Sequence, residues 1–141
     1  MKLSTRSRYG VRLMASLACA NGDKPVLLKD IATAEEISEK YLSLIVIPLR
    51  AAGLIKSQRG ARGGYFLTKD PCDISLKEII EAIEGEISLV NCIKQPSACV
   101  RSYICPTRDI WNTLESKINE TLNDIKLSQL AQTRKEKIKH A

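Results

Sequence analysis

The stretch LKDIATAEEISEKYLSLIVIPLRAAGLIKSQRGARGGYFL, residues 28–67, decides the fold. It opens with apolar residues at helical spacing for about two turns, so a short helix is expected before a connection at residues 35–37. Ser38 is then a good N-cap for a longer helix, and Gly53 is suited to end it. The apolar face of this second helix comprises Tyr41, Leu42, Ile45, Leu49 and Ala52. This order predicts a helix-turn-helix, whose second helix can lie in the DNA major groove.

Pro48 conflicts with a straight second helix. Proline has no backbone N–H and its ring collides with the preceding turn, at a cost of about 3 kcal/mol inside a helix. The sequence therefore predicts either a kink near Ile47 or an earlier helix end.

A glycine-rich turn follows, between two short β-prone runs at residues 54–58 and 65–68. Glycine allows positive φ angles and lets the backbone approach a phosphate closely. Arg59 and Arg62 give the turn a cationic tip, which suits the negative potential of the minor groove. A solvated hairpin without function is the alternative, but the position directly after a helix-turn-helix favours the wing of a winged helix.

The flanking segments add further helices. Ser4 is suited to cap a first helix, residues 21–25 form a turn by composition, and Ser75 with Glu78 makes a capping box before another helix. A C-terminal helix of about 20 residues carries one apolar stripe, formed by Trp111, Leu114, Ile118, Leu122 and Ile125. A long helix with one apolar seam typically packs against its symmetry mate, so a homodimer is expected.

These patterns predict a mainly α fold with a small β-hairpin. Four regions are expected: a winged helix-turn-helix DNA-binding region at 1–70, a linking helix and cysteine loop at 71–104, a dimerisation helix at 105–130 and a flexible tail at 131–141.

The positive charge lies in the first half of the chain. Residues 1–70 hold 12 Lys and Arg against 6 Asp and Glu, whereas residues 71–141 hold 10 of each. This asymmetry is typical of a module that binds a polyanion such as DNA. The N-terminus has no apolar signal segment and the chain has no run of 18 apolar residues, so a cytoplasmic protein without membrane contact is expected.

Cys92, Cys99 and Cys105 form a C-x6-C-x5-C pattern just before the C-terminal helix. Structural zinc sites typically use cysteine pairs two to four residues apart, so the spacing does not favour zinc. Three thiolates on one loop suit an iron–sulfur cluster. Three unligated cysteines, or a reversible disulfide switch, are the alternatives. The other two cysteines are set apart: Cys19 is interpreted as a core residue, and Cys72 as a candidate for a fourth ligand.

Several motifs together resemble a known family, the bacterial winged-helix transcriptional regulators of the IscR and NsrR type. They are MKLSTRSRYGVRLM, KDIA, SEKYL, LRAAGLIKSQRGARGGYFL, the three-cysteine loop and CPTRDIW, and they cover roughly residues 1–130. The resemblance implies a homodimer crossed through the long helix and a dyad-symmetric promoter site. By likeness, Ser38, Lys40 and Tyr41 would begin the recognition helix, and Arg59 would enter the minor groove.

Two positions depart from the family's pattern. Arg108 stands where IscR-like proteins place a histidine three residues after the last cysteine, and Arg8 stands where NsrR-like proteins use an acidic residue of the partner subunit. The fourth cluster ligand is therefore open, and with it the choice between a [2Fe-2S] and a [4Fe-4S] cluster. Candidates are Asp109, Ser43, Thr107, Cys72, a solvent molecule or a small thiol.

The sequence thus predicts a DNA-binding transcriptional regulator, not an enzyme, without a small-molecule substrate. Its iron–sulfur cluster, bound by Cys92, Cys99 and Cys105, is expected to report cluster, iron, redox or nitric oxide status. One alternative is a cluster-free winged-helix regulator switched by thiol oxidation or zinc. Another is a small iron–sulfur electron carrier, which would need neither the charge asymmetry nor the basic wing.

Overall fold

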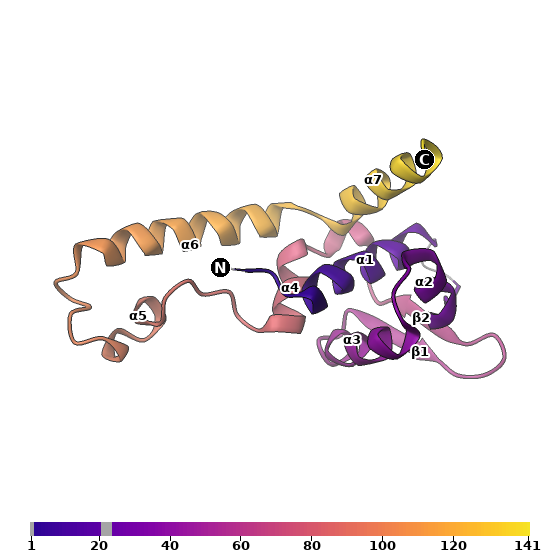
Figure 1. Cartoon of the computed structure of the whole chain (residues 1–141), viewed down its shortest axis with the longest axis horizontal. Helices are drawn as coiled ribbons and strands as arrows, with labels where there is room; N and C mark the ends of the chain where they lie inside the picture. Colours follow the sequence, from indigo (N-terminus) through magenta and orange to yellow (C-terminus); the bar gives the residue numbers. More distant parts are fainter. Residues whose placement is uncertain (1, 21–23) are drawn as a thin grey trace.

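The structure, a computed structural model, describes residues 2–20 and 24–141 (Figure 1). Most of the turn expected at residues 21–25 lies outside the described residues. The elements in chain order are α1 (Thr5–Cys19), α2 (Leu28–Glu35), α3 (Glu39–Ala51), β1 (Ile55–Gln58), β2 (Gly64–Leu67), the 3₁₀ turn η1 (Pro71–Asp73), α4 (Leu76–Glu84), α5 (Asn91–Lys94), the 3₁₀ turn η2 (Pro96–Ala98), α6 (Pro106–Asp124) and α7 (Leu127–Lys139). The predicted mainly α fold with a small β-hairpin is confirmed.

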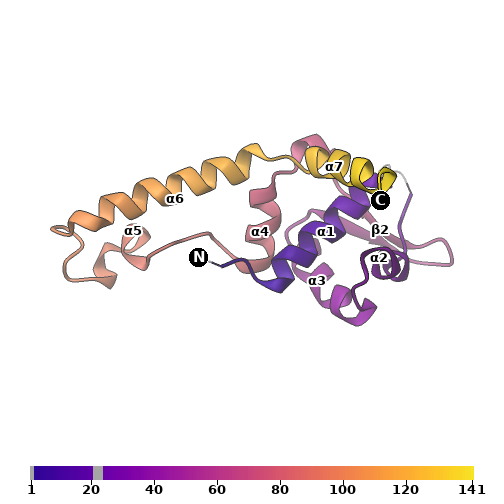
Figure 2. The same cartoon turned by 45° about the horizontal axis from the view of Figure 1, so that its top comes forward.

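The body of the molecule is built around α1, which packs against α2, α3, α4, β2 and α7 (Figure 2). Ser4 is the N-cap of α1, as expected, and its hydroxyl accepts a hydrogen bond from the Ser7 backbone at 3.1 Å. Burying one leucine or isoleucine side chain stabilises a fold by about 1.5–3 kcal/mol, so the core of this body provides most of its stability. The side chains buried there include Leu13, Met14, Leu42, Ile45, Leu49, Ile74, Ile79 and Leu127.

Helix α3 continues through Pro48 to Ala51, so the earlier helix end offered as one option is wrong. Because Pro48 has no N–H, the carbonyl of Leu44 has no helical donor four residues later. Leu44 lies on the exposed side of α3, where water can satisfy that carbonyl. Gly53 follows the helix end with φ +75°, and its N–H donates to Arg50 O at 2.9 Å, which is the position that glycine favours after a helix.

The β-hairpin is antiparallel and is joined at one edge by a third piece of chain. Ile55 pairs with Leu67 and Gln58 with Gly64. Val26 and Tyr65 exchange backbone hydrogen bonds of 2.8 and 2.9 Å, which fix β2 to the segment before α2. Gly64 has φ +147°, and a Cβ there would lie 2.5 Å from the Val26 carbonyl oxygen. This close approach requires glycine.

Helix α6 extends away from the body as an arm, and the chain between α4 and α6 runs out along it (Figures 1 and 2). The arm is fixed at its body end by two hydrogen bonds of 2.8 Å, from Leu76 N to Ile125 O and from Leu127 N to Ile74 O. The predicted capping box of Ser75 and Glu78 is present at the start of α4. In the part of the chain that the structure describes, no helix is both long and apolar enough to cross a membrane.

The structure corrects the expected C-terminal organisation. The long helix ends at Asp124, and residues 127–139 form a separate helix, α7, in place of a flexible tail from residue 131. Leu127 and Ala131 are buried against the body. Arg134 binds the Glu35 carboxylate. Helix α7 thus packs against α1 and η1 with few buried apolar residues, and the Arg134–Glu35 ion pair adds a contact to α2.

Candidate nucleic-acid interface and cysteine segment

Helices α2 and α3 form a helix-turn-helix. Glu36 takes the left-handed conformation, with φ 55°, and Ile37 N donates to Ala32 O at 3.1 Å, which reverses the chain within three residues. Ile37 is buried and anchors this turn. The Ser38 hydroxyl accepts a hydrogen bond from Tyr41 N at 3.1 Å, so Ser38 is the N-cap expected from the sequence. This cap fixes the residue at which α3 begins.

The residues expected at the start of the recognition helix differ in their surroundings. Ser38 and Lys40 are exposed. Tyr41 is half-buried, and its ring meets the ring of Tyr9 edge-on, with centroids 5.6 Å apart and an interplanar angle of 83°. Such aromatic pairs are worth about 0.5–1.5 kcal/mol beyond burial. Tyr41 therefore holds α3 against α1, and Ser38 and Lys40 are the members of this group that solvent reaches freely.

Arg59 and Arg62 are both exposed at the tip of the hairpin, and neither takes part in an ion pair among the described residues. The tip depends on its glycines. Gly60 has φ +107°, and Gly63 N donates to Gly60 O at 3.0 Å. A Cβ on Gly63 would lie 2.2 Å from the Gln58 carbonyl oxygen. The tight turn therefore presents two unpaired cations to solvent.

Sequence reasoning missed Arg6 as a residue of this surface. Arg6 lies on the exposed side of α1, yet it lines one hollow together with Tyr41, Leu44 and Ile47 of α3. The i, i+3 and i, i+4 spacing within α1 could have indicated its side of that helix, but not its position next to α3.

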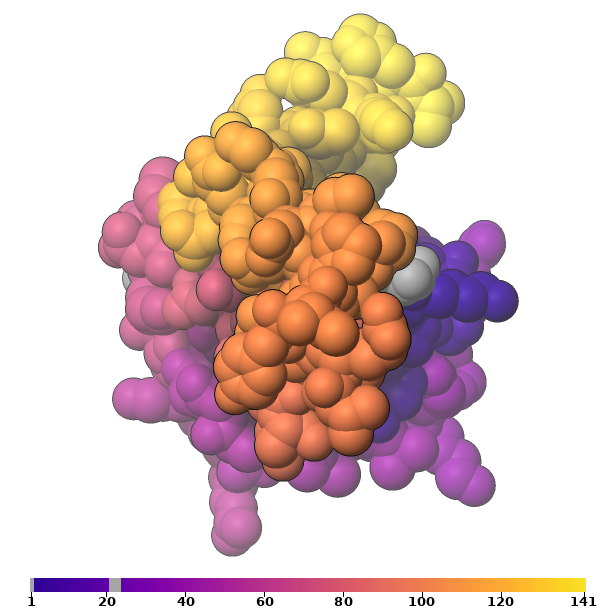
Figure 3. All heavy atoms as spheres, turned by 90° about the vertical axis from the view of Figure 1, so that its left-hand side faces the viewer, coloured from indigo at the N-terminus to yellow at the C-terminus, as the bar shows by residue number. Residues whose placement is uncertain are grey.

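The segment from α5 to the start of α6 lies at the free end of the arm (Figures 1 and 3), and it carries the three cysteines of the C-x6-C-x5-C pattern. Cys92 lies in α5 and is half-buried, Cys99 follows η2 and is exposed, and Cys105 is the half-buried N-cap residue of α6. The buried hydroxyl of Ser102 holds the loop between them by donating to Pro96 O at 2.6 Å and to Cys99 O at 2.8 Å.

Arg108 connects the two ends of this segment. Its Nε donates to Cys92 O at 3.0 Å and its guanidinium also reaches Ile93 O at 3.4 Å, so it ties α5 to the first turn of α6. A buried carboxylate fixes the segment further: Glu115 of α6 accepts a hydrogen bond from Leu89 N at 2.9 Å. Glu115 was not expected to be structural, because its partner is a backbone N–H 26 residues away.

The thiol of Cys105 has a distinct environment. Its Sγ lies 3.1 Å from Thr107 Oγ1, and the hydrogen bond from Thr107 lowers the pKa of the Cys105 thiol. The backbone N–H groups of Thr107 and Arg108, at the start of α6, act in the same direction. A lowered pKa favours the thiolate, which is the form that binds metals and attacks disulfides.

The three thiols do not converge. Across residues 2–20 and 24–141, no three His, Cys, Asp or Glu side chains are grouped as they would be around a metal ion. The donor chemistry nevertheless fits an iron–sulfur cluster, since thiolates are its usual ligands. Two candidates for a fourth ligand, Thr107 and Asp109, lie in the first turn of α6. Cys72 lies in η1, which packs against α7 at the other end of the arm.

Comparison with known proteins gives a consistent result. Residues 3–133 match the family model Rrf2, described as "Iron-dependent Transcriptional regulator". The HTH-type transcriptional regulator CymR of Bacillus subtilis is 40% identical over 131 residues, which are 93% of this chain and 90% of CymR.

Solved structures of such regulators have the same fold. CymR, titled the global cysteine regulator of B. subtilis, superposes with a TM-score of 0.79 at 38% identity, covering 94% of this chain and 98% of CymR. T. potens IscR gives 0.76 at 36% identity, with coverages of 96% and 90%. An oxidized form of Staphylococcus aureus CymR gives 0.74 at 37% identity, with coverages of 93% and 96%.

Proposed function

Because the chain belongs to the Rrf2 family of transcriptional regulators, we propose that it binds a dyad-symmetric DNA site as a homodimer and that the chemical state of Cys92, Cys99 and Cys105 controls this binding. One observation carries the proposal. The three cysteines lie at the free end of α6, and the other end of α6 is hydrogen-bonded to the body that bears α3 and the wing. No catalytic role is proposed.

For DNA binding, α3 would enter the major groove with Ser38 and Lys40 at its leading end. Arg59 and Arg62 of the wing would lie along the adjacent minor groove, where narrow A·T-rich segments attract arginine. Tyr41 would act indirectly, by fixing α3 to Tyr9 of α1. The exposed cations at the wing tip have no acidic partner among the described residues, and this supports the assignment, because no ion pair recorded there is lost when they bind phosphate.

For dimerisation, α6 offers the Trp111–Leu114 end of its apolar stripe and the neighbouring Ile110, which its own chain leaves open, whereas the rest of the stripe is half-buried. Ile110, Trp111 and Leu114 are exposed, with 40% of the Trp111 surface accessible, and Glu115 is the buried residue of this helix. A second copy packing antiparallel or crossed on this stripe would bury it under two-fold symmetry. Two recognition helices would then face half-sites about one helical turn, 34 Å, apart.

For sensing, Cys92, Cys99 and Cys105 would hold an iron–sulfur cluster, either [2Fe-2S] or [4Fe-4S], with a fourth ligand from Asp109, Thr107, solvent or a small thiol. When bound, the cluster supplies a redox-active, iron-dependent group that responds to iron, cluster, redox or nitric oxide status. The chain's own part is to bring three thiols together by closing the loop around Ser102 while Arg108 keeps α5 beside α6. Similarity to T. potens IscR supports this candidate.

A second candidate is a cluster-free switch by thiol oxidation. The lowered pKa of Cys105 and the exposure of Cys99 favour it, because a thiolate can form a disulfide with an accessible thiol of the same segment once the loop between them closes. Two thiols would lose two protons and two electrons to an oxidant such as diamide. The global cysteine regulator CymR of B. subtilis and an oxidized form of Staphylococcus aureus CymR are among the similar proteins. Zinc bound by the same thiols is a third state that metal analysis distinguishes.

One experiment separates these candidates. Protein purified without oxygen is assayed for iron, sulfide, zinc and visible absorption, and its DNA affinity is measured by fluorescence anisotropy before and after removal of iron by a chelator. A cluster predicts iron with sulfide, and a DNA affinity that changes on removal. In Cys92→Ser, Cys99→Ser and Cys105→Ser, both the iron with sulfide and the change in DNA affinity should be lost. The matched control is Cys72→Ser, since Cys72 is exposed but lies outside the segment.

Two other results would replace the cluster assignment. Colourless protein without sulfide after reconstitution excludes the cluster. If diamide then changes the DNA affinity, dithiothreitol restores it, and the effect disappears in the same cysteine variants, thiol oxidation is the switch. A protein that binds no duplex from a random-sequence library contradicts the proposed function as a whole.

A further inference from the structure

The exposed side of α3 carries two large apolar side chains. Leu44 is 53% exposed and Ile47 is 61% exposed, whereas Leu42, Ile45 and Leu49 on the other side are fully buried. Residues three apart in a helix are surface neighbours. Leu44 and Ile47 line the same hollow, of about 380 Å³, in which the ring of Pro48 extends the apolar surface.

Nothing within the chain covers this pair in the described part of the structure, and the core face of α3 is complete without it. A single exposed leucine is ordinary on a protein surface. Here two large apolar side chains lie together on the solvent-facing side of α3, and they form an apolar patch on the surface of the helix-turn-helix. Exposed cations surround them: Arg6 lines the same hollow, and Lys40 and Arg50 lie toward the two ends of α3.

An apolar centre with a cationic rim matches the DNA major groove. Phosphates bound the groove on both sides, and its floor offers one apolar group, the C5-methyl of thymine. An apolar protein partner would not account for Arg6, Lys40 and Arg50 around the pair. The charge pattern therefore selects nucleic acid as the occupant.

We propose that Leu44 and Ile47 determine sequence specificity by contacting the methyl groups of thymines in each half-site. This inference rests on the proposed DNA-binding function. Three residues of α-helix span about 4.5 Å, and neighbouring base pairs are about 3.4 Å apart. The two side chains thus reach thymines on neighbouring base pairs. The half-site contains such a pair, and Lys40 and the wing arginines contribute affinity that does not depend on those methyl groups.

Replacing thymine by uracil tests this directly, because the substitution removes only the methyl group. Duplexes are first selected with the wild-type protein from a random-sequence library. The preferred duplex is then remade with deoxyuridine at one thymine at a time. Removing a contacted methyl group should weaken wild-type binding by about three- to fivefold. Two neighbouring positions in each half-site should show this loss, and the other thymines should not.

Variants assign the effect to the two side chains. Leu44→Ala should bind thymine and uracil equally at one of the two positions, and Ile47→Ala at the other. Both residues are exposed, so the variants should fold, as circular dichroism will verify. Ile138→Ala is the matched control: Ile138 is a similarly exposed apolar residue on α7, and its variant should keep the full preference for thymine. Arg59→Ala should weaken binding to both the thymine and the uracil duplexes and leave the ratio of the two affinities unchanged.

The outcomes separate this inference from the proposed function. If the wild type selects a duplex but is indifferent to every uracil substitution, thymine reading is overturned and DNA binding stands. A uracil effect that persists in both Leu44→Ala and Ile47→Ala assigns the methyl contact to other residues and also overturns it. Failure to select any duplex overturns both.

Discussion

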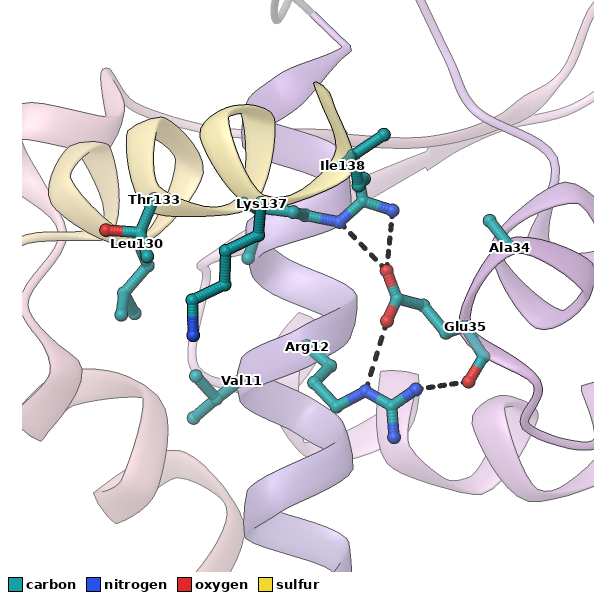
Figure 4. A pocket seen from close by; sticks show the side chains of 10 residues that line it. Val11, Arg12, Ala34, Glu35, Leu130, Thr133, Lys137 and Ile138 are labelled. Atoms are coloured by element: carbon teal, nitrogen blue, oxygen red, sulfur yellow. Dashed lines mark hydrogen bonds and ion pairs between the residues drawn. The ribbon is translucent and has the colours of Figure 1, made fainter. Parts of the chain in front are cut away.

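The carboxylate of Glu35 accepts hydrogen bonds of 2.7 and 2.9 Å from the guanidinium of Arg134, 99 residues later in the chain. Glu35 is the last residue of α2, and Arg12 of α1 holds its other carboxylate oxygen at 3.1 Å and also its backbone carbonyl (Figure 4). These contacts join the first helix of the helix-turn-helix to α7. Helix α7 follows the body end of α6 directly in the chain. The ion pair between Arg134 and Glu35 therefore connects that end of the arm to the DNA-binding region.

Arg134→Ala should lower the free energy of unfolding by about 1–2 kcal/mol, between the values for exposed and for buried ion pairs, because Glu35 is buried and retains only Arg12. Urea denaturation followed by circular dichroism measures this. Lys135→Ala is the control, since Lys135 is exposed on the same helix and should leave the stability unchanged. Equal stability of the two variants would remove the structural role of the contact.

The hydrogen bond from Ser4, at the start of α1, to Glu84, the last residue of α4, should make the thermal stability depend on pH. The hydrogen bonds of Ser4 and Ser7 lower the pKa of Glu84 below its usual range, and Ser4 N lies 2.8 Å from Oε1. A lowered folded-state pKa stabilises the fold above the unfolded value of about 4.3, and this stabilisation is lost as the pH falls through the folded pKa. Melting temperatures of wild type and Glu84→Gln should therefore differ at pH 7 and converge at low pH. A constant difference would contradict this.

Gly64→Ala should disturb the wing more than Gly60→Ala. Both glycines have positive φ, but a Cβ on Gly64 would lie 2.5 Å from the Val26 carbonyl oxygen, whereas Gly60 has open space around it. Backbone strain alone costs about 1 kcal/mol, and the displaced Val26–Tyr65 pairing adds to it in Gly64→Ala. Thermal unfolding of the two variants measures the difference, and equal losses would show that the Val26 contact is dispensable.

The parts of the fold that were predictable from the sequence depend on local chemistry. Ser38 caps α3, glycines shape the wing, and the Ser75–Glu78 capping box starts α4. The resemblance to the family indicated a function, DNA binding, for the same segments. Helix α7 was missed because its docking depends on Glu35, 99 residues earlier, and on only two buried apolar side chains. Tyr41 was expected at DNA, but its contact with Tyr9 depends on how α1 crosses α3.

Trp111→Asp should convert the proposed homodimer into a monomer. Trp111 lies on the open apolar stripe of α6, and a charge there would have to be desolvated in an interface formed by two copies. Light scattering coupled to size-exclusion chromatography measures the mass. Ile138→Asp, on α7 and outside the stripe, is the control and should remain dimeric. A wild-type monomer, or a dimer in both variants, would place the interface elsewhere.

Arg59→Ala should weaken binding to a selected duplex by about 1–3 kcal/mol if the arginine contacts base edges in the minor groove. If it also neutralises a phosphate, the slope of log affinity against log salt should fall by about 0.9. Fluorescence anisotropy between about 50 and 200 mM salt gives both quantities. Lys139→Ala is the control, since Lys139 is an exposed cation in the last turn of α7 and should change neither. Because Arg59 has no ion pair within the described chain, its removal should not lower the stability of the free protein, so unchanged affinity would mean that Arg59 does not contact DNA.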